Sequence, residues 1–126
     1  MTLGFPVNWP ADCPPNDAVD AEGIVFRIVK IEPVTADDMA SHHETGKLLK
    51  APACLRCGLS VFREIQDAFH QRQLIPKLGK LVAKATLQAS HGKTKLTDGK
   101  QPTHTTWWPY EGIDRASLFA AVAEEG

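Results

Sequence analysis

The stretch Gly23-Ile24-Val25-Phe26-Arg27-Ile28-Val29-Lys30-Ile31 decides the fold of this chain. Successive side chains of a β-strand point to opposite sides, so Ile24, Phe26 and Ile28 share one face and the alternate residues share the other. Both faces are then largely apolar, which is typical of a central strand that is covered on two sides. Arg27 is the exception, because an arginine inside a buried strand needs partners for its charge.

Two further strands and a hairpin are predicted downstream. Residues 80–89 alternate between apolar and polar side chains, which is the pattern of a half-buried strand, and residues 104–108 form another short strand. His91-Gly92 and Asp98-Gly99 are turn signals. We therefore expect residues 94–97 to pair back as the arm of an antiparallel hairpin.

Helices are predicted in three places. A polar helix is expected between Thr35 and Gly46, a second from Ser60 or Arg63 to Leu74, and a last one after Asp114. Residues 48–58 are expected to form a loop, and residues 59–62 are expected to form either a short strand or the beginning of the second helix. The fold class is therefore α+β, with a small mixed or antiparallel sheet of about four strands and two or three helices.

The whole chain is expected to form one domain. Its 126 residues are a common size for a single core. Residues 1–22 contain four prolines and no regular period, which predicts an extended arm. Phe5 and Trp9 are the residues that we expect to pack this arm, 1–22, onto the rest of the domain, 1–126.

Composition and charge exclude several classes of protein. The hydrophobic share of 43% and the charged share of 23% are those of a globular chain rather than a disordered one. No apolar run reaches the roughly 18 residues of a membrane span, and the start of the chain has no secretory pattern, so we expect a cytoplasmic protein without a membrane partner. A net charge of −1 argues against a nucleic-acid partner. The lysines from Lys77 to Lys100 fit either a solvated surface or a surface for an anionic ligand.

The three cysteines, Cys13, Cys54 and Cys57, do not form the even set of a disulfide-stapled secreted domain. Cys54-Leu55-Arg56-Cys57-Gly58 has the spacing of half a zinc site, which needs two more ligands from Cys13 or the histidines. A redox pair and two ordinary reduced thiols are the alternatives. We expect no disulfide from Cys54 or Cys57 to Cys13.

Residues 104–111 gather aromatic and titratable groups. Trp107, Trp108 and Tyr110 combine stacking surface with a polar group, which suits a polar ligand. The alternative is a tryptophan-rich lid that seals the edge of the sheet. On a strand, His104 shares a face with Trp108 and not with Trp107.

Arg27 and His104 are the candidate catalytic residues. Arginine can hold a phosphate or carboxylate with two hydrogen bonds, and histidine can carry a proton at neutral pH. Glu44, His42 or Glu64 would supply further acid–base groups. We therefore hypothesise a small ligand-binding or enzymatic domain for a polar, nucleotide-like molecule. The rival hypothesis is a noncatalytic protein-interaction module, zinc-stapled and homo-oligomeric. A structure with Arg27 and His104 on opposite sides of the sheet would remove the first hypothesis.

Overall fold

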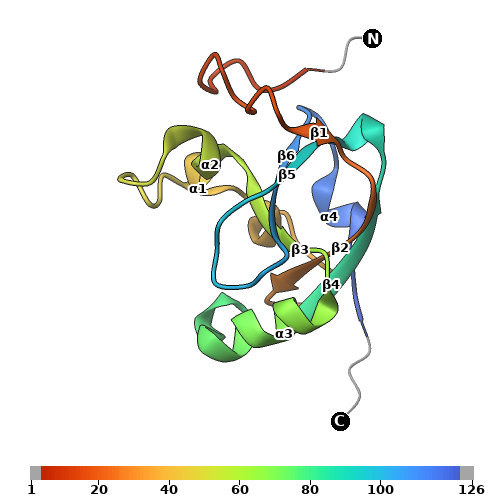
Figure 1. The fold of residues 1–126 in the computed structure, drawn as a ribbon. Coiled ribbons are helices and arrows are strands. Elements are labelled where there is room, and N and C mark those ends of the chain that lie inside the picture. Colours follow the sequence, from red (N-terminus) through yellow and green to blue (C-terminus); the bar gives the residue numbers. More distant parts are fainter. Residues whose placement is uncertain (1–3, 123–126) are drawn as a thin grey trace.

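One antiparallel sheet of seven strands runs through the molecule, in the order β1-β5-β6-β3-β2-β4-β7 (Figure 1). The computed structural model describes residues 4–122. Its strands are β1 Val19–Asp20, β2 Gly23–Val29, β3 Leu59–Phe62, β4 Leu81–Leu87, β5 Gly92–Leu96, β6 His104–Pro109 and β7 Ala120–Ala121. The expected sheet of about four strands is therefore wrong. Three of the additional strands have only two to four residues, too few to show a period in the sequence.

The central position predicted for β2 is confirmed. β2 pairs with β4 along its whole length, from Gly23 opposite Leu87 to Val29 opposite Leu81. Its other neighbour is β3, which it meets in register only where Phe26 lies opposite Phe62. The two strands therefore diverge beyond this pair, and a side chain from β2 has room to reach the backbone of β3.

The predicted hairpin exists, but its partner strand lies later in the chain. β5 pairs with β6, from Gly92 opposite Pro109 to Leu96 opposite Thr105, and with the short β1 on its other side. The turn between β5 and β6 contains the predicted Asp98-Gly99 signal. This hairpin brings residue 97 next to His104, whose carbonyl accepts a hydrogen bond from the Thr97 backbone N–H.

Short helices and turns replace two of the longer helices that the sequence predicts. The helices are α1 His42–Thr45, α2 Ala53–Cys57, α3 Ile65–Leu74 and α4 Arg115–Leu118, with 3₁₀ turns η1 Asp37–Met39, η2 Pro76–Leu78 and η3 Ala89–His91. The expected helix 35–46 is broken because Ser41 forms a new capping box with Glu44. The expected loop 48–58 contains α2, and the last helix ends at Leu118, where the chain turns into β7.

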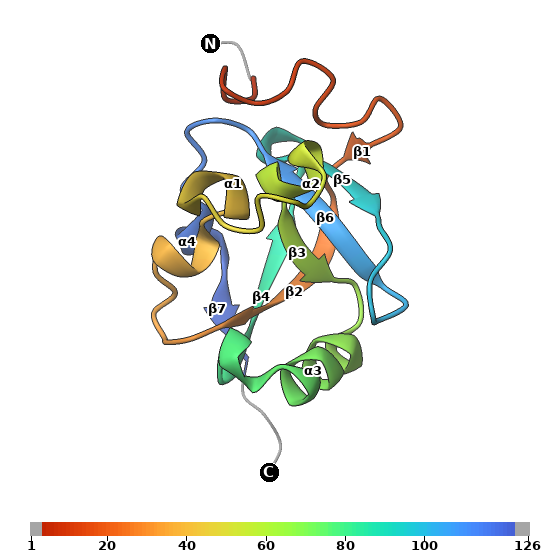
Figure 2. The same cartoon turned by 90° about the vertical axis from the view of Figure 1, so that its left-hand side faces the viewer.

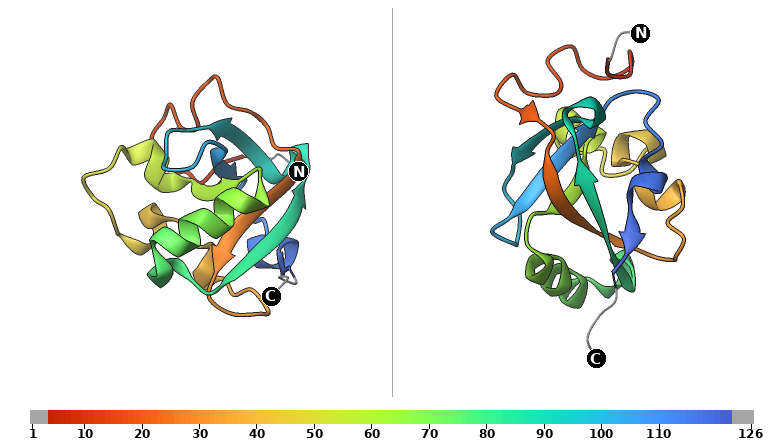
Figure 3. Two further views of the ribbon diagram at one scale, coloured as in Figure 1. Left: turned by 60° about the horizontal axis from the view of Figure 1, so that its bottom comes forward. Right: turned by 90° about the vertical axis from the view of Figure 1, so that its right-hand side faces the viewer.

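Each face of the sheet carries its own apolar residues. We call the side that bears Val25 and Val29 the core face, because it packs against Met39 of η1 and against Phe119 after α4. The opposite side, the arm face, is covered at one end by α3 over Phe62 and at the other end by the N-terminal arm and α2. Figures 2 and 3 show the arm and α3 at these two ends. No helix among residues 4–122 is long and apolar enough to cross a bilayer.

The N-terminal arm, residues 4–18, packs through aromatic side chains. Phe5 stacks on Trp9 with ring centroids 5.3 Å apart and meets Tyr110 at 4.7 Å. Trp9 is 7% exposed, and its cluster continues to Trp108 of β6. Part of the expected arm 1–22 forms the edge strand β1, and residues 1–3 lie outside the described part.

Candidate functional site

His104 lies on the arm face, at the start of β6. It stands directly opposite Phe62 of β3, which belongs to the apolar cluster under α3. The two rings make an edge contact with centroids 5.7 Å apart. Thr106 and Trp108 follow on the same face, as the alternation of the strand requires.

A chain of hydrogen bonds runs through the imidazole of His104. Its Nε2 lies 3.0 Å from Ser60 Oγ, and its Nδ1 lies 3.0 Å from Thr97 Oγ1 and 3.3 Å from the Thr97 carbonyl oxygen. A carbonyl oxygen can only accept, so the contact with Thr97 O assigns the ring proton to Nδ1. Nε2 is then the acceptor that faces the Ser60 hydroxyl. Thr97 Oγ1 continues the chain to Thr106 Oγ1 at 2.8 Å.

The hairpin turn holds the imidazole in place from a second side. A Cβ built on Gly99 would lie 2.7 Å from His104 Cγ and 3.0 Å from His104 Cβ, both close to the root of the side chain. Only a residue without a Cβ lets the backbone approach the ring so closely. His104 is therefore positioned by the turn at Gly99, by Phe62 and by Thr97.

The Ser60 hydroxyl is on an exposed stretch of strand. Ser60 is exposed, whereas its neighbours Leu59 and Val61 point into the core face and are buried. Ser60 lies opposite Thr106, which in turn lies opposite Lys95 of β5. This cross-strand row of Ser60, Thr106 and Lys95, with His104 beside it, separates the two apolar clusters of the arm face. Figure 2 shows β3 running between α2 and α3.

Lys95 links this row to the N-terminal arm. Its Nζ lies 2.8 Å from Asp17 Oδ2. The hydrogen bond from Lys95 is the main cause that lowers the pKa of the Asp17 carboxyl, which lies on the surface. Such a surface pair contributes little to stability, so the ammonium group remains available to an anionic ligand at small cost.

Arg27 is on the core face and does not meet His104. Its Nη1 donates to the Ser60 carbonyl at 2.8 Å, and its Nε and Nη2 donate to the Asp38 carbonyl at 3.1 and 3.0 Å. Burial lowers the pKa of Arg27 to about 10, Asp38 opposes this shift and Arg115 adds to it. The expected pocket shared by Arg27 and His104 is therefore not formed, and the hypothesis of a ligand site that combines these two residues is removed. The guanidinium instead fills the gap where β2 and β3 diverge.

The three aromatic residues predicted to bind a ligand have other partners. Trp107 and Trp108 are completely buried, and their indole N–H groups donate to the carbonyls of His91 and Cys54 at 3.1 and 2.9 Å. Tyr110 is half-buried against Phe5. Neither indole presents a free face to solvent, because both are packed inside the domain on an inner strand rather than at the edge of the sheet.

Among residues 4–122, none of the further acid–base candidates forms a hydrogen bond with the His104 ring. Glu44 forms a two-pronged pair with Arg115, with Nη1–Oε1 and Nη2–Oε2 distances of 2.7 and 3.0 Å. This pair borders two open hollows of about 420 Å³ each, one next to η1 and one next to the arm. His42 is the first residue of α1, and burial together with the charges of Arg27, Lys47 and Arg56 lowers its pKa. Glu64, at the start of α3, donates its backbone N–H to Thr103 Oγ1.

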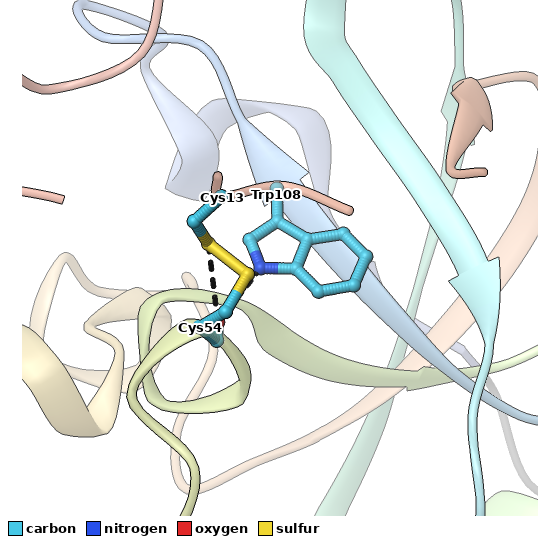
Figure 4. The surroundings of a disulfide bond; sticks show 3 residues. All are labelled: Cys13, Cys54 and Trp108. Atoms are coloured by element: carbon cyan, nitrogen blue, oxygen red, sulfur yellow. Dashed lines mark hydrogen bonds between the residues drawn. A yellow bond between two sulfur atoms is a disulfide. The ribbon is translucent and has the colours of Figure 1, made fainter. Parts of the chain in front are cut away.

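The cysteines do not adopt the expected reduced state. Cys13 of the arm and Cys54 of α2 form a disulfide, so the expectation that Cys54 makes no bond to Cys13 is wrong (Figure 4). The proposed pair of metal ligands, Cys54 and Cys57, is thereby divided, because Cys57 is a free and buried thiol. Burial raises the pKa of Cys57, Arg56 opposes this shift and Glu44 adds to it. Residues 4–122 contain no group of three or more His, Cys, Asp or Glu side chains placed to hold a metal.

Sequence reasoning identified His104 but missed Ser60, Thr97 and Gly99. The Asp98-Gly99 turn signal was the only local indication that the hairpin would fold against His104. Ser60 could not be found, because its role depends on the pairing of β3 with β6 across 44 residues of sequence. Comparisons of the chain with protein-family models, with curated proteins and with solved structures find no match.

Proposed function

We propose that this protein is a small enzyme in which Ser60 is a nucleophile and His104 is its general base. The observation that carries the proposal is the hydrogen-bonded sequence Ser60 Oγ, His104 Nε2, His104 Nδ1 and Thr97. A nucleophile, a base and a group that orients the base are the recurring parts of serine-based acyl transfer. The exposed position of Ser60 supports the proposal, because a substrate can reach it.

The proposed reaction is the hydrolysis of an ester by a covalent route. His104 Nε2 takes the proton from Ser60 Oγ as this oxygen attacks the carbonyl carbon of the ester. The imidazolium then returns the proton to the departing alkoxide, which leaves an acyl group on Ser60. Water, activated by the same Nε2, releases the acid and restores the serine. General base catalysis of this kind contributes about 10²- to 10⁴-fold to a rate.

The proposed substrate is polar and carries an anionic group, as a nucleotide-like molecule does. Lys95 supports this choice, because it lies in the same cross-strand row as Ser60 and Thr106. Its partner Asp17 is on the surface, where an ion pair exchanges readily with a competing anion. Stacking of the ligand on Trp107 or Trp108 has no part in the proposal, because both indoles are buried.

Ester hydrolysis by variants tests this function. We expect p-nitrophenyl acetate to be hydrolysed by the natural protein, and Ser60→Ala and His104→Asn each to lower kcat/KM by at least about 100-fold. Ser117→Ala is the matched control, because Ser117 is also exposed and bonds only to a nearby carbonyl among the described residues. With the anionic p-nitrophenyl hemisuccinate, Lys95→Gln should raise KM and leave kcat unchanged. Hydrolysis at the natural rate by Ser60→Ala would refute the proposal.

A second candidate function is the noncatalytic protein-interaction module. The observation that favours it is the exposed apolar turn between α1 and α2, where Leu48 is 59% and Leu49 is 74% exposed. Self-association through this turn would make the protein a homo-oligomer. Sedimentation at two protein concentrations tests this function: association that is lost in Leu49→Ser supports it, whereas a monomer at both concentrations contradicts it.

We keep the cytoplasm as the proposed location and zinc as a proposed ligand of reduced Cys54 and Cys57. The disulfide argues against both proposals. Disulfides are rare in cytoplasmic proteins, and a disulfide-bonded sulfur cannot serve as a thiolate ligand. Cells that express the protein are quenched with acid, and their free thiols are then alkylated. This measures whether Cys13 and Cys54 are oxidised or reduced in the cell. A fully formed disulfide in the cell would contradict both the location and the zinc site.

A further inference from the structure

All three cysteines are gathered in one apolar cluster at the arm end of the sheet. Cys13 and Cys57 are buried there with Trp9, Ala18 and Trp108, and Cys54 packs against the same group. Figure 4 shows the disulfide beside the indole of Trp108. Two of these sulfurs form the disulfide between the arm and α2, and the third is a thiol. The same cluster therefore contains one disulfide and one free thiol.

Cys54 can reach either partner. Cys57 follows it by three residues on α2, and residues at this spacing are neighbours on a helix surface, about 5–6 Å apart at Cβ. A disulfide needs a Cβ separation of about 4 Å. α2 has five residues and ends at Cys57. Bringing the Cβ atoms of Cys54 and Cys57 close enough for a disulfide therefore disturbs only a terminal helical turn.

We propose that Cys57 is the exchange partner of the Cys13–Cys54 disulfide, so that the three sulfurs support two alternative pairings. In the exchange, the Cys57 thiol loses its proton and its thiolate attacks Cys54 Sγ. The Cys54–Cys57 bond forms as the Cys13–Cys54 bond breaks, and Cys13 leaves as a thiolate that takes up a proton. One disulfide is present before and after the step, so no oxidant or reductant is consumed.

The Cys13–Cys54 pairing is the resting form. Burial raises the pKa of the Cys57 thiol, which keeps the attacking thiolate scarce while the arm is in place. Displacement of the arm opens the cluster to water and removes this restraint. Exchange then leaves the arm without its covalent link to α2, and the same arm carries Asp17, the partner of Lys95 in the row with Ser60. The disulfide exchange therefore couples the position of the arm to the exposure of the row of Ser60, Thr106 and Lys95.

Disulfide mapping with trypsin distinguishes the two pairings, because Arg56 lies between Cys54 and Cys57. Cleavage places Cys13, Cys54 and Cys57 in peptides 1–27, 51–56 and 57–63. The natural protein would be incubated at pH 8 in urea concentrations below its unfolding transition, and free thiols would be blocked before digestion. We expect the linkage of 1–27 to 51–56 in buffer, and the linkage of 51–56 to 57–63 to increase with urea while the circular dichroism stays native.

Two variants complete the test. Cys57→Ala, which keeps the cluster apolar, should show only the linkage of 1–27 to 51–56 and a slower cleavage of the arm by protease. Cys13→Ser should form the linkage of 51–56 to 57–63 on oxidation. A natural protein that retains only the first linkage at every urea concentration where it is folded would overturn the proposal, whatever the variants show. Failure of folded Cys13→Ser to join Cys54 to Cys57 would overturn it as well.

Discussion

The backbone of Gly99 lies so close to the side chain of His104 that a Cβ added at Gly99 would be 2.7 Å from His104 Cγ. Gly99→Ala should therefore force either the hairpin turn or the ring to move. Because a displacement of about 1 Å at a catalytic group can cost up to about 100-fold, we expect the rate of ester hydrolysis to fall by roughly 10- to 100-fold. The added methyl should destabilise the fold by about 1–3 kcal/mol.

The control for Gly99→Ala is Gly4→Ala, since an added Cβ at Gly4 meets nothing within 4 Å. Rates measured under conditions in which each variant is fully folded separate the effect on the reaction from the effect on stability. A Gly99→Ala variant with the natural rate would show that the turn does not position His104.

Arg27 is expected to act on stability rather than on the reaction. Its guanidinium satisfies the carbonyls of Ser60 and Asp38, and the shorter, single-headed lysine cannot reach both. Arg27→Lys should lower the free energy of unfolding by about 3 kcal/mol in urea titration. The rate at which the folded variant hydrolyses esters should stay within roughly threefold of the natural rate, because the Ser60–His104 contact is on the other face. A stable but inactive Arg27→Lys would instead support the catalytic role predicted for Arg27.

Loss of the Cys13–Cys54 disulfide should destabilise the protein strongly. The bond joins residues 41 positions apart, and the chain-entropy estimate for a loop of this size is about 4 kcal/mol. Urea unfolding of Cys13→Ser and of the natural protein, each with and without reductant, measures this difference. The reductant should weaken the natural protein by more than it weakens Cys13→Ser, in which only the short Cys54–Cys57 loop can be closed. Equal midpoints for the oxidised and reduced natural protein would contradict the prediction.

We expect Glu44 to make the free energy of unfolding depend on pH. Burial acts to raise its pKa, but the hydrogen bonds from Arg115 and Ser41 and the charge of Arg115 outweigh burial and hold the pKa below its ordinary value of 4.5. The unfolded chain then binds a proton at higher pH than the folded chain does. The contribution of Glu44 is complete above its unfolded pKa and is lost as the pH falls through the folded value.

Glu44→Gln should accordingly flatten the stability profile as the pH falls below the ordinary carboxyl pKa of 4.5. Because the Glu44 side chain is 38% exposed, we expect a loss of no more than about 1 kcal/mol at neutral pH. Glu111→Gln is the control, since Glu111 lines the hollow on the arm side of the same ion pair. Parallel profiles for the natural protein and Glu44→Gln would refute the assignment.

The sequence predicted those features that local patterns control. The alternation around Val25 and Val29 gave the central strand and its two faces, and the alternation in residues 104–108 gave the shared face of His104 and Trp108. Short edge strands and the break in the helix at Ser41 were not predictable, because each depends on a few contacts rather than on a period. The disulfide was missed because the folding of the arm over α2 brings together residues that no spacing rule connects.

The central claim is that Ser60 is a nucleophile activated by His104, and covalent labelling tests it most directly. A fluorophosphonate probe reacts with an activated serine, which displaces fluoride and forms a stable bond to phosphorus. We expect the label on tryptic peptide 57–63, in which Ser60 is the single hydroxyl residue, and we expect His104→Asn to lose it. An unlabelled peptide 57–63, or equal labelling of the natural protein and His104→Asn, would contradict the claim.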